Sequence, residues 1–219
     1  MEIRRTANAG VLLKLDGVSI LLDGVCREVK PYPVTPPEER AALSTCWPDV
    51  VAFTHAHKDH YDSAFAAEFV KQTGGVILGP ADLPGVQASM ASASAGGVTV
   101  TPVPSRHIGA AGKTTSHVSF IVQGSSCVWF LGDSSPFLWK ERTELPAPDV
   151  LIVPYAYATT ATGWEITRSL HPKAVVLLHM PEREKDNIGL WDAVETTVGQ
   201  ESSLLIPEIG QNIFLDKLL

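Results

Sequence analysis

The sequence predicts an α/β or α+β fold built from layered sheets, because segments with strand and helix patterns alternate along the chain. The opening is one observation behind this class: two apolar runs, 10–15 and 18–23, flank the pair Asp16-Gly17, which is the pattern of a β-hairpin. A second observation is a set of short runs rich in β-branched, aromatic and aliphatic residues, each with the length of a buried strand. These runs are 50–53, 98–103, 127–131, 150–154 and 174–178.

The segments between these runs carry start and stop signals of their own. A Pro-rich connection over 26–48 contains a short helix that begins at Pro37, since proline is well placed in a first helical turn. Asp62 and Ser63 can cap a helix that runs to about Lys71. We also expect a strand at 76–78, a helix of small residues around 83–94 closed by Gly96-Gly97, helices at 164–170 and 187–198, and strands at 203–206 and 213–215.

The composition is that of an ordinary globular protein. With 219 residues, of which 45% are hydrophobic and 19% charged, we expect a single domain, 1–219, with a substantial core. No apolar run approaches the ~20 residues that span a bilayer, and residues 1–5 lack the apolar segment of a signal peptide, so we expect a cytoplasmic protein without membrane contact. The net charge of −7 disfavours nucleic acid as a partner, because phosphate binding needs clustered Lys and Arg. A small molecule is the expected partner, and the sequence leaves homo-oligomers open.

The three cysteines do not indicate a disulfide framework, because they are few and odd in number. Cys127 lies within a strand run and is expected in the core. Cys26 and Cys46 flank the loop-rich connection, where either could be exposed.

The most informative stretch is 54–60, Thr-His-Ala-His-Lys-Asp-His, because neutral imidazole and carboxylate are preferred ligands of zinc and similar ions. Histidines two apart on an extended segment point the same way, so His55 and His57 can hold one ion. Asp59 and His60 follow, where a turn could carry them to a second ion. The alternative is a histidine-rich surface loop.

Further candidate ligands stand at the ends of other predicted strands. His107 follows the run 98–103, Asp133 follows 127–131, and His179 follows 174–178 directly. Each alone could be a hydrogen-bonded core histidine or a turn aspartate. If the strands end at one edge of the sheets, however, their ligands converge on one site, as strand-end loops commonly do.

The order of these residues, HxHxDH, a distant His, Gly-Asp after a strand and a late His, resembles the metallo-β-lactamase superfamily. Within it the chain is similar to the compact branch that includes ascorbate-6-phosphate lactonase-like proteins. The opening hairpin that ends in Asp23, the stretch 150–154 and the ending 206–210 add to the resemblance. It implies a four-layer αββα sandwich with the metal site at one edge between the two sheets.

The resemblance also implies a binuclear site. His55, His57 and His107 would hold the first metal, Asp59, His60 and His179 the second, and Asp133 would bridge them. A hydroxide between the metals would attack a carbonyl or phosphorus atom, and Asp59 would orient it and pass a proton to the leaving group. Zinc is the expected metal, with manganese or iron as alternatives.

Four residues are candidates for contact with the substrate. They are Arg106, His117, Tyr155 and Tyr157, which stand next to His107, before a predicted strand, and after the run 150–154. For Arg106 a structural salt bridge, for His117 a surface or core role, and for the tyrosines simple packing are the alternatives.

The leading functional hypothesis is a metal-dependent hydrolase that acts on a small lactone, ester, amide or thioester. A phosphodiesterase acting on a small phosphodiester is a second hypothesis. A non-hydrolytic di-iron redox or metal-binding protein is a third. Ascorbate-6-phosphate itself is not expected as substrate, because the sequence has no evident sugar-phosphate pocket, and the connection 26–48 could shape the cleft.

Overall fold

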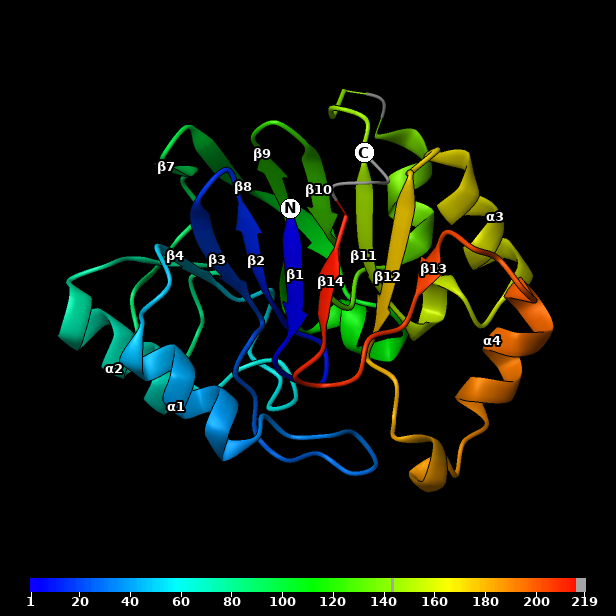
Figure 1. Ribbon diagram of the computed structural model, residues 1–219, viewed down its shortest axis with the longest axis horizontal. Coiled ribbons are helices and arrows are strands. Elements are labelled where there is room, and N and C mark those ends of the chain that lie inside the picture. The colour runs from blue at the N-terminus through cyan, green and yellow to red at the C-terminus, as the bar shows by residue number, and fades with distance from the viewer. Residues whose placement is uncertain (143, 216–219) are drawn as a thin grey trace.

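The computed structural model describes residues 1–142 and 144–215, and two seven-stranded sheets form its centre (Figure 1). The first sheet has the order β14 (Asn212–Phe214), β1 (Glu2–Arg5), β2 (Val11–Leu15), β3 (Val18–Leu22), β4 (Val50–Ala52), β5 (Ile77–Leu78) and β6 (Ala88–Ser89). The second has the order β13 (Leu204–Leu205), β12 (Ala174–Leu178), β11 (Val150–Pro154), β10 (Cys127–Phe130), β9 (Ser116–Gln123), β8 (Val98–Arg106) and β7 (Ala93–Ala95).

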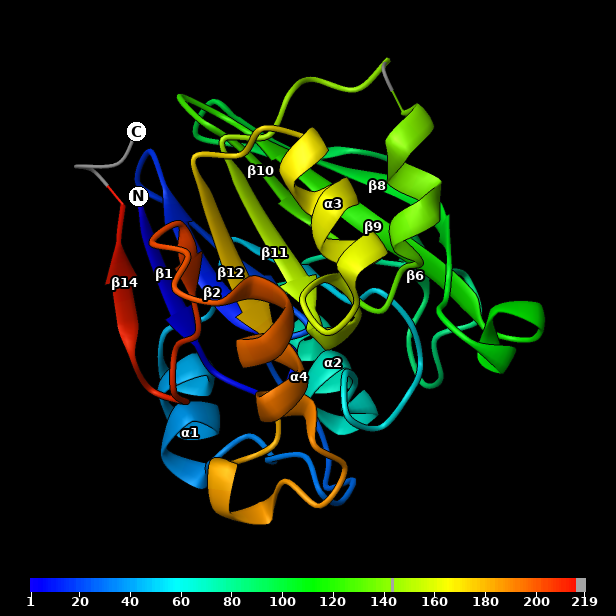
Figure 2. The same cartoon turned by 90° about the vertical axis from the view of Figure 1, so that its right-hand side faces the viewer.

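Helices cover the outer face of each sheet, which confirms the four-layer αββα sandwich. Four α-helices lie in the described residues: α1 (Pro37–Thr45), α2 (Ser63–Thr73), α3 (Ala161–Ser169) and α4 (Leu190–Val198). Helices α1 and α2 flank the first sheet, and Figure 2 shows α3 and α4 against the second. Short 3-10 turns occur at Ala110–Lys113, Pro136–Glu141, Tyr155–Tyr157 and Arg183–Lys185. Within the described residues, no helix is both long and apolar enough to cross a membrane.

The strand runs are continuously apolar because both faces of each sheet are buried. In β11, Val150 and Ile152 point into the core between the sheets, whereas Leu151 and Val153 point to the core beneath α3 and α4. This alternation is the two-residue period of a strand. A third core joins the outer face of the first sheet to α1 and α2.

Strand direction decides where the site forms. Strands β10, β11 and β12 are parallel to one another, and β8 runs the same way as β10 because both are antiparallel to β9. The carboxyl ends of β8, β10 and β12 therefore lie at one edge of the second sheet. The residues that follow these three strands meet there, as predicted.

The helix start at Asp62 is confirmed. Its carboxylate accepts a hydrogen bond from the Phe65 amide at 3.0 Å, and Gly74, with a φ of 68°, ends the helix after Thr73. The predicted helices 164–170 and 187–198 correspond to α3 and α4 with shifted boundaries.

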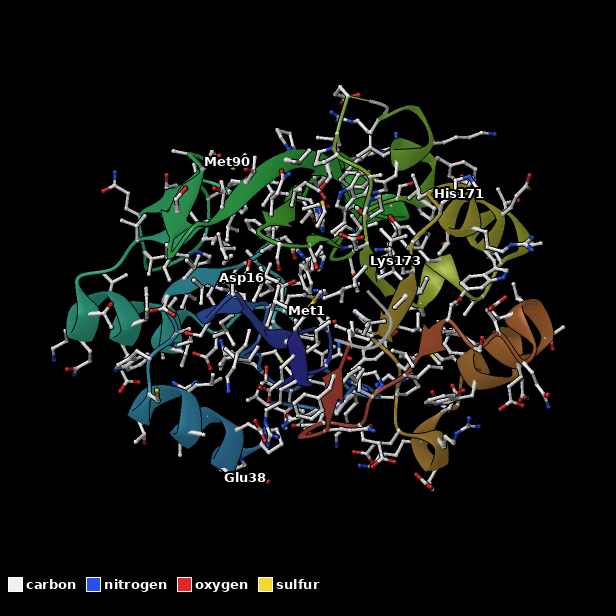
Figure 3. The ribbon with its side chains drawn as sticks, turned by 45° about the horizontal axis from the view of Figure 1, so that its top comes forward. Met1, Asp16, Glu38, Met90, His171 and Lys173 are labelled. Atoms are coloured by element: carbon white, nitrogen blue, oxygen red, sulfur yellow. The ribbon has the colours of Figure 1, made fainter. Side chains whose placement is uncertain are left out.

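The prediction of a helix around 83–94 is wrong. Residues in this segment form β6 at the edge of the first sheet and β7 at the edge of the second, so the chain crosses between the sheets here, near Met90 (Figure 3). Gly96 and Gly97 both have positive φ, 52° and 85°, and connect β7 to β8 as a two-residue hairpin loop. The glycine pair that resembled a helix stop is a hairpin turn, and the small residues before it pair along strand edges.

The structure separates the three cysteines. All three are free: Cys127 is buried, as predicted, and Cys46 is exposed. The expectation that Cys26 could be exposed is wrong, since it is buried and its amide donates to Thr35 Oγ1 at 2.9 Å.

The hairpin turn gives a test of the fold. We expect Gly97→Ala to lower the free energy of unfolding by about 1 kcal/mol, because alanine is strained at positive φ. Gly97→Asn should cost less, since asparagine tolerates this conformation. Urea denaturation measures both. If Gly97→Ala left the stability unchanged or raised it, the positive φ at this position, and with it the hairpin turn, would be contradicted.

Candidate metal centre

The structure brings all seven predicted metal ligands together. The ligand atoms of His55, His57 and His107 lie within 4.8 Å of one another, and so do those of Asp59, His60 and His179. We call these the first and second triads. Each is the set that the resemblance implied for one metal.

The turn after β4 explains the geometry of the motif. The amides of His60 and Tyr61 both donate to the carbonyl of His57, at 3.0 and 2.9 Å, and this turn carries Asp59 and His60 away from the strand. His55 and His60 are each fully buried. The alternative of a histidine-rich surface loop is therefore wrong.

Asp133 lies between the two triads. Its Oδ2 atom is 3.5 Å from His107 Nε2 in the first triad, and 3.4 and 3.5 Å from His60 Nε2 and His179 Nε2 in the second. Burial alone would raise the pKa of Asp133, but His179 and His60 outweigh it and hold the pKa well below its usual range. The carboxylate is thus charged and lies where a bridging ligand would.

The approach of Asp133 to the motif depends on the residue before it. Gly132 has a φ of 50°, and a Cβ atom there would lie 2.6 Å from the side chain of Thr54. A larger residue would push the Asp133 turn away from the motif that follows β4.

Asp23 is a site residue that the sequence analysis did not identify. Its fully buried carboxylate accepts hydrogen bonds from the Thr54 amide (2.7 Å), from Thr54 Oγ1 (2.6 Å) and from His60 Nδ1 (2.9 Å). The signal was present, because Asp23 ends the second strand of the opening hairpin just as other site residues end other strands.

These bonds fix the tautomers of the histidines. Thr54 Oγ1 gives its one hydrogen to Asp23, so the His55 Nδ1–H donates to Thr54 Oγ1 at 2.9 Å. His60 Nδ1 and His107 Nδ1 donate to Asp23 and to the carbonyl of Ile108. In each ring Nε2 is thereby left as the nitrogen that can ligate a metal.

Unpaired buried atoms show that these residues fit metal ions. Unsatisfied buried polar atoms are rare in folded proteins, since each costs about 1–3 kcal/mol. Here several converge on one place, and imidazole nitrogen with carboxylate oxygen is a donor set that suits divalent zinc, manganese or iron. Buried atoms without a hydrogen bond partner in the described residues include Nε2 of His55, His60, His107 and His179, and Oδ1 of Asp133.

His117 lies next to the first triad. Its buried ring is 5.0 Å from that of His55 and 5.7 Å from that of His107. Ser119 Oγ donates to the carbonyl of Leu131, so Ser105 Oγ donates to Ser119 Oγ, and His117 Nδ1 donates to Ser105 Oγ at 2.7 Å. His117 therefore keeps a free lone pair on Nε2, which has no partner in the described part of the chain.

The other predicted substrate contacts differ in their burial and in their distance from the site. The ring of Tyr155 lies 5.5 Å from that of His179. Arg106 is exposed at the end of β8. The prediction for Tyr157 is wrong, because this side chain is fully buried in the core beneath α3 and its hydroxyl is hydrogen-bonded with Ser134.

Of two further aromatic residues, Tyr32 contacts the site and His171 does not. Tyr32, from the Pro-rich connection, packs edge-on against His179 with ring centroids 4.3 Å apart, and no feature of the sequence marked it. His171 lies beside the end of α3, outside the groups that could hold a metal ion (Figure 3).

The tautomer of His117 can be measured in metal-free protein. Burial lowers the pKa of His117 to about 3, so at pH 6 we expect a neutral ring with hydrogen on Nδ1, visible in long-range ¹H–¹⁵N correlation spectra. Because the unfolded chain protonates this ring below its usual pKa near 6.5, His117 makes the protein less stable as pH falls from 6.5 toward 3. Ser105→Ala should allow the ring hydrogen of His117 to occupy either nitrogen, because it removes the acceptor of Nδ1. A ring with hydrogen on Nε2 in the unaltered protein would contradict the hydrogen-bond order.

Comparison with known proteins places the chain in a family. The sequence matches the Beta-lactamase superfamily domain over residues 2–179, a range that contains every ligand of both triads and Asp133. No curated protein shows a significant match. The finer likeness to ascorbate-6-phosphate lactonase-like proteins stays a prediction.

Several solved structures share the fold at low sequence identity. A possible metal-dependent hydrolase from Veillonella parvula has a TM-score of 0.71 at 18% identity, covering 97% of this chain and 98% of that one. Isothiocyanate hydrolase from Delia radicum gut bacteria has 0.69 at 16%, covering 98% and 99%. CmlA, a diiron β-hydroxylase from Streptomyces venezuelae, has 0.66 at 16%, covering 97% of this chain and 53% of that chain.

These likenesses show a common fold, and the domain match extends over most of the chain, including the whole set of candidate ligands. The chain therefore belongs to the beta-lactamase superfamily.

Proposed function

We propose that the protein is a metal-dependent hydrolase that holds two divalent cations and cleaves a small lactone, ester, amide or thioester. Zinc is the metal that we expect in the site. The observation that carries the proposal is the set of buried, unpaired Nε2 atoms that converge around Asp133. Membership of the beta-lactamase superfamily supports the general class.

The two triads would hold the cations, and Asp133 would bridge them. When bound, such ions lower the pKa of water to roughly 7 and polarise a carbonyl oxygen. Asp23 and Thr54 orient His60 and His55 through the hydrogen bonds to their Nδ1 atoms, so the ligand atoms do not have to reorganise.

Asp59 is the proposed proton carrier. Its Oδ2 atom is 3.1 Å from His179 Nε2, and its side chain is 14% exposed, so an incoming substrate can reach it. Burial alone would raise the pKa of Asp59, but the nearby imidazoles of His179 and His60 outweigh it and lower the pKa. The carboxylate is therefore ionised at neutral pH and can accept a proton and later return it to a leaving group.

The proposed substrate contacts are Tyr155 and His117, with Arg106 at the rim. Burial raises the pKa of Tyr155, with the charges of Asp133 and Asp59 adding to it, so its hydroxyl stays a hydrogen-bond donor. His117 offers an acceptor at Nε2. Together they would place a donor and an acceptor beside the triads for a small polar group.

The role of Asp59 predicts a kinetic loss without loss of the site. We expect Asp59→Asn to lower kcat by about 10² to 10⁴-fold, the usual contribution of a general acid or base, while the first triad still binds metal. Asp62→Asn is the matched control, because asparagine also caps α2. Full activity of Asp59→Asn against lactone, p-nitrophenyl ester and thioester substrates would refute the role.

Metal content tests the site itself. Elemental mass spectrometry of protein purified without chelator should give close to two equivalents, and His107→Ala should reduce this to about one. His171→Asn, outside the cluster, should leave the content unchanged. Two equivalents of iron would favour redox chemistry over hydrolysis. The absence of metal after reconstitution would overturn the proposal.

A further inference from the structure

A groove of about 770 Å³ lies between the Pro-rich connection and the residues that follow β12. The residues 28–36 form one wall, and 182–187 with Ile209 form the other. An adjoining hollow of about 490 Å³ shares Pro33, Glu182 and Ile209 with the groove and reaches Met180, the residue after His179. The groove and the hollow each have the size of a small-molecule site.

Tyr32 connects the groove to the metal centre. Its side chain lines the groove, and its ring contacts that of His179 at 4.3 Å between centroids. Tyr32 therefore both lines the groove and contacts the metal centre.

The wall that carries Tyr32 is held to the metal-binding motif. The amide of Arg27 donates to the carbonyl of Lys58, between His57 and Asp59. The amide of Tyr32 donates to the carbonyl of Val29 at 2.9 Å, which closes a turn. Because these bonds are present before any substrate arrives, this wall of the groove is pre-formed.

The residues that line the groove carry no net charge, and most of them are uncharged. Two lysines and two glutamates lie along it, and Lys185 is paired with Glu182 at 2.6 Å. In the adjoining hollow the guanidinium of Arg5 donates to main-chain carbonyl oxygens only. The remaining surface is supplied largely by Pro31, Tyr32, Pro33, Val34, Pro36, Asn187 and Ile209.

We propose that this groove receives the uncharged apolar tail of the substrate, while the scissile carbonyl lies at the metal centre and Tyr32 contacts the junction. The inference rests on the proposed hydrolase function. It names the substrate class as a neutral acyl compound with an aliphatic or aromatic tail. A sugar phosphate or another polyanion would find no balancing cluster of cations among the described residues that line the groove.

A chain-length series tests the groove. The zinc-loaded protein is assayed with p-nitrophenyl acetate, butyrate and octanoate, and we expect kcat/KM to rise by at least about tenfold from acetate to octanoate. Val34→Asp places a charge on the groove wall at a residue that is 42% exposed, and should lower the octanoate-to-acetate ratio by about tenfold. Val76→Asp, at an exposed valine outside the groove, is the matched control and should leave the series unchanged.

A binding measurement separates the two proposals. N-methyloctanamide, which is neutral and resists hydrolysis, should bind the zinc-loaded protein in calorimetry at least tenfold more tightly than N-methylacetamide, and Val34→Asp should remove the difference. Binding of this kind without hydrolysis of any ester would refute the hydrolase and support the groove. Hydrolysis with equal rates across the series, or a Val34→Asp ratio equal to that of Val76→Asp, would overturn the groove.

Discussion

The buried carboxylate of Asp23 is the constraint on which the metal centre depends. A carboxylate removed from water is stable only if its oxygens are hydrogen-bonded, and here Thr54 and His60 supply three donors. The same bonds join the end of β3 to the motif after β4 and set two ring tautomers. If the carboxylate were lost, Thr54 Oγ1 could turn, and His55 and His60 would no longer be fixed with their lone pairs toward the site.

The centre itself is costly without metal. The rings of His55, His60 and His107 pack within about 5 Å of one another or of a shared neighbour, and their Nε2 atoms have no hydrogen-bond partner in the described residues. Each unsatisfied buried atom costs about 1–3 kcal/mol. The αββα layers sustain this cost because three hydrophobic cores pack independently of the site. Bound cations would convert the same atoms into stabilising contacts, so metal binding and stability are linked.

Sequence patterns predicted those parts of the molecule in which local chemistry and tertiary position agree. The apolar runs became strands, and the motif with its strand-end partners became two triads around Asp133, because parallel strands end at one edge. The helix prediction for 83–94 failed because alanine and serine pack equally well in a helix or at a sheet edge. Only pairing with neighbouring strands decides between the two structures. The prediction for Tyr157 failed because the residues after β11 turn into the core. Tyr32 was missed because it reaches the site through a loop whose path no periodicity encodes.

The loops that follow β3 and β12 determine which side chains lie beside the metal centre. Asp23 and His179 stand at the ends of β3 and β12, and the two walls of the groove follow them directly along the chain. The ligands are fixed by the sheets, whereas the walls belong to loops whose side chains can change while the main-chain bond from Arg27 to Lys58 is kept. His107 and Asp133 instead follow strands whose next residues turn back onto the second sheet. The second triad is therefore the side of the centre at which substrate specificity can be built, and Tyr32 stands at that boundary.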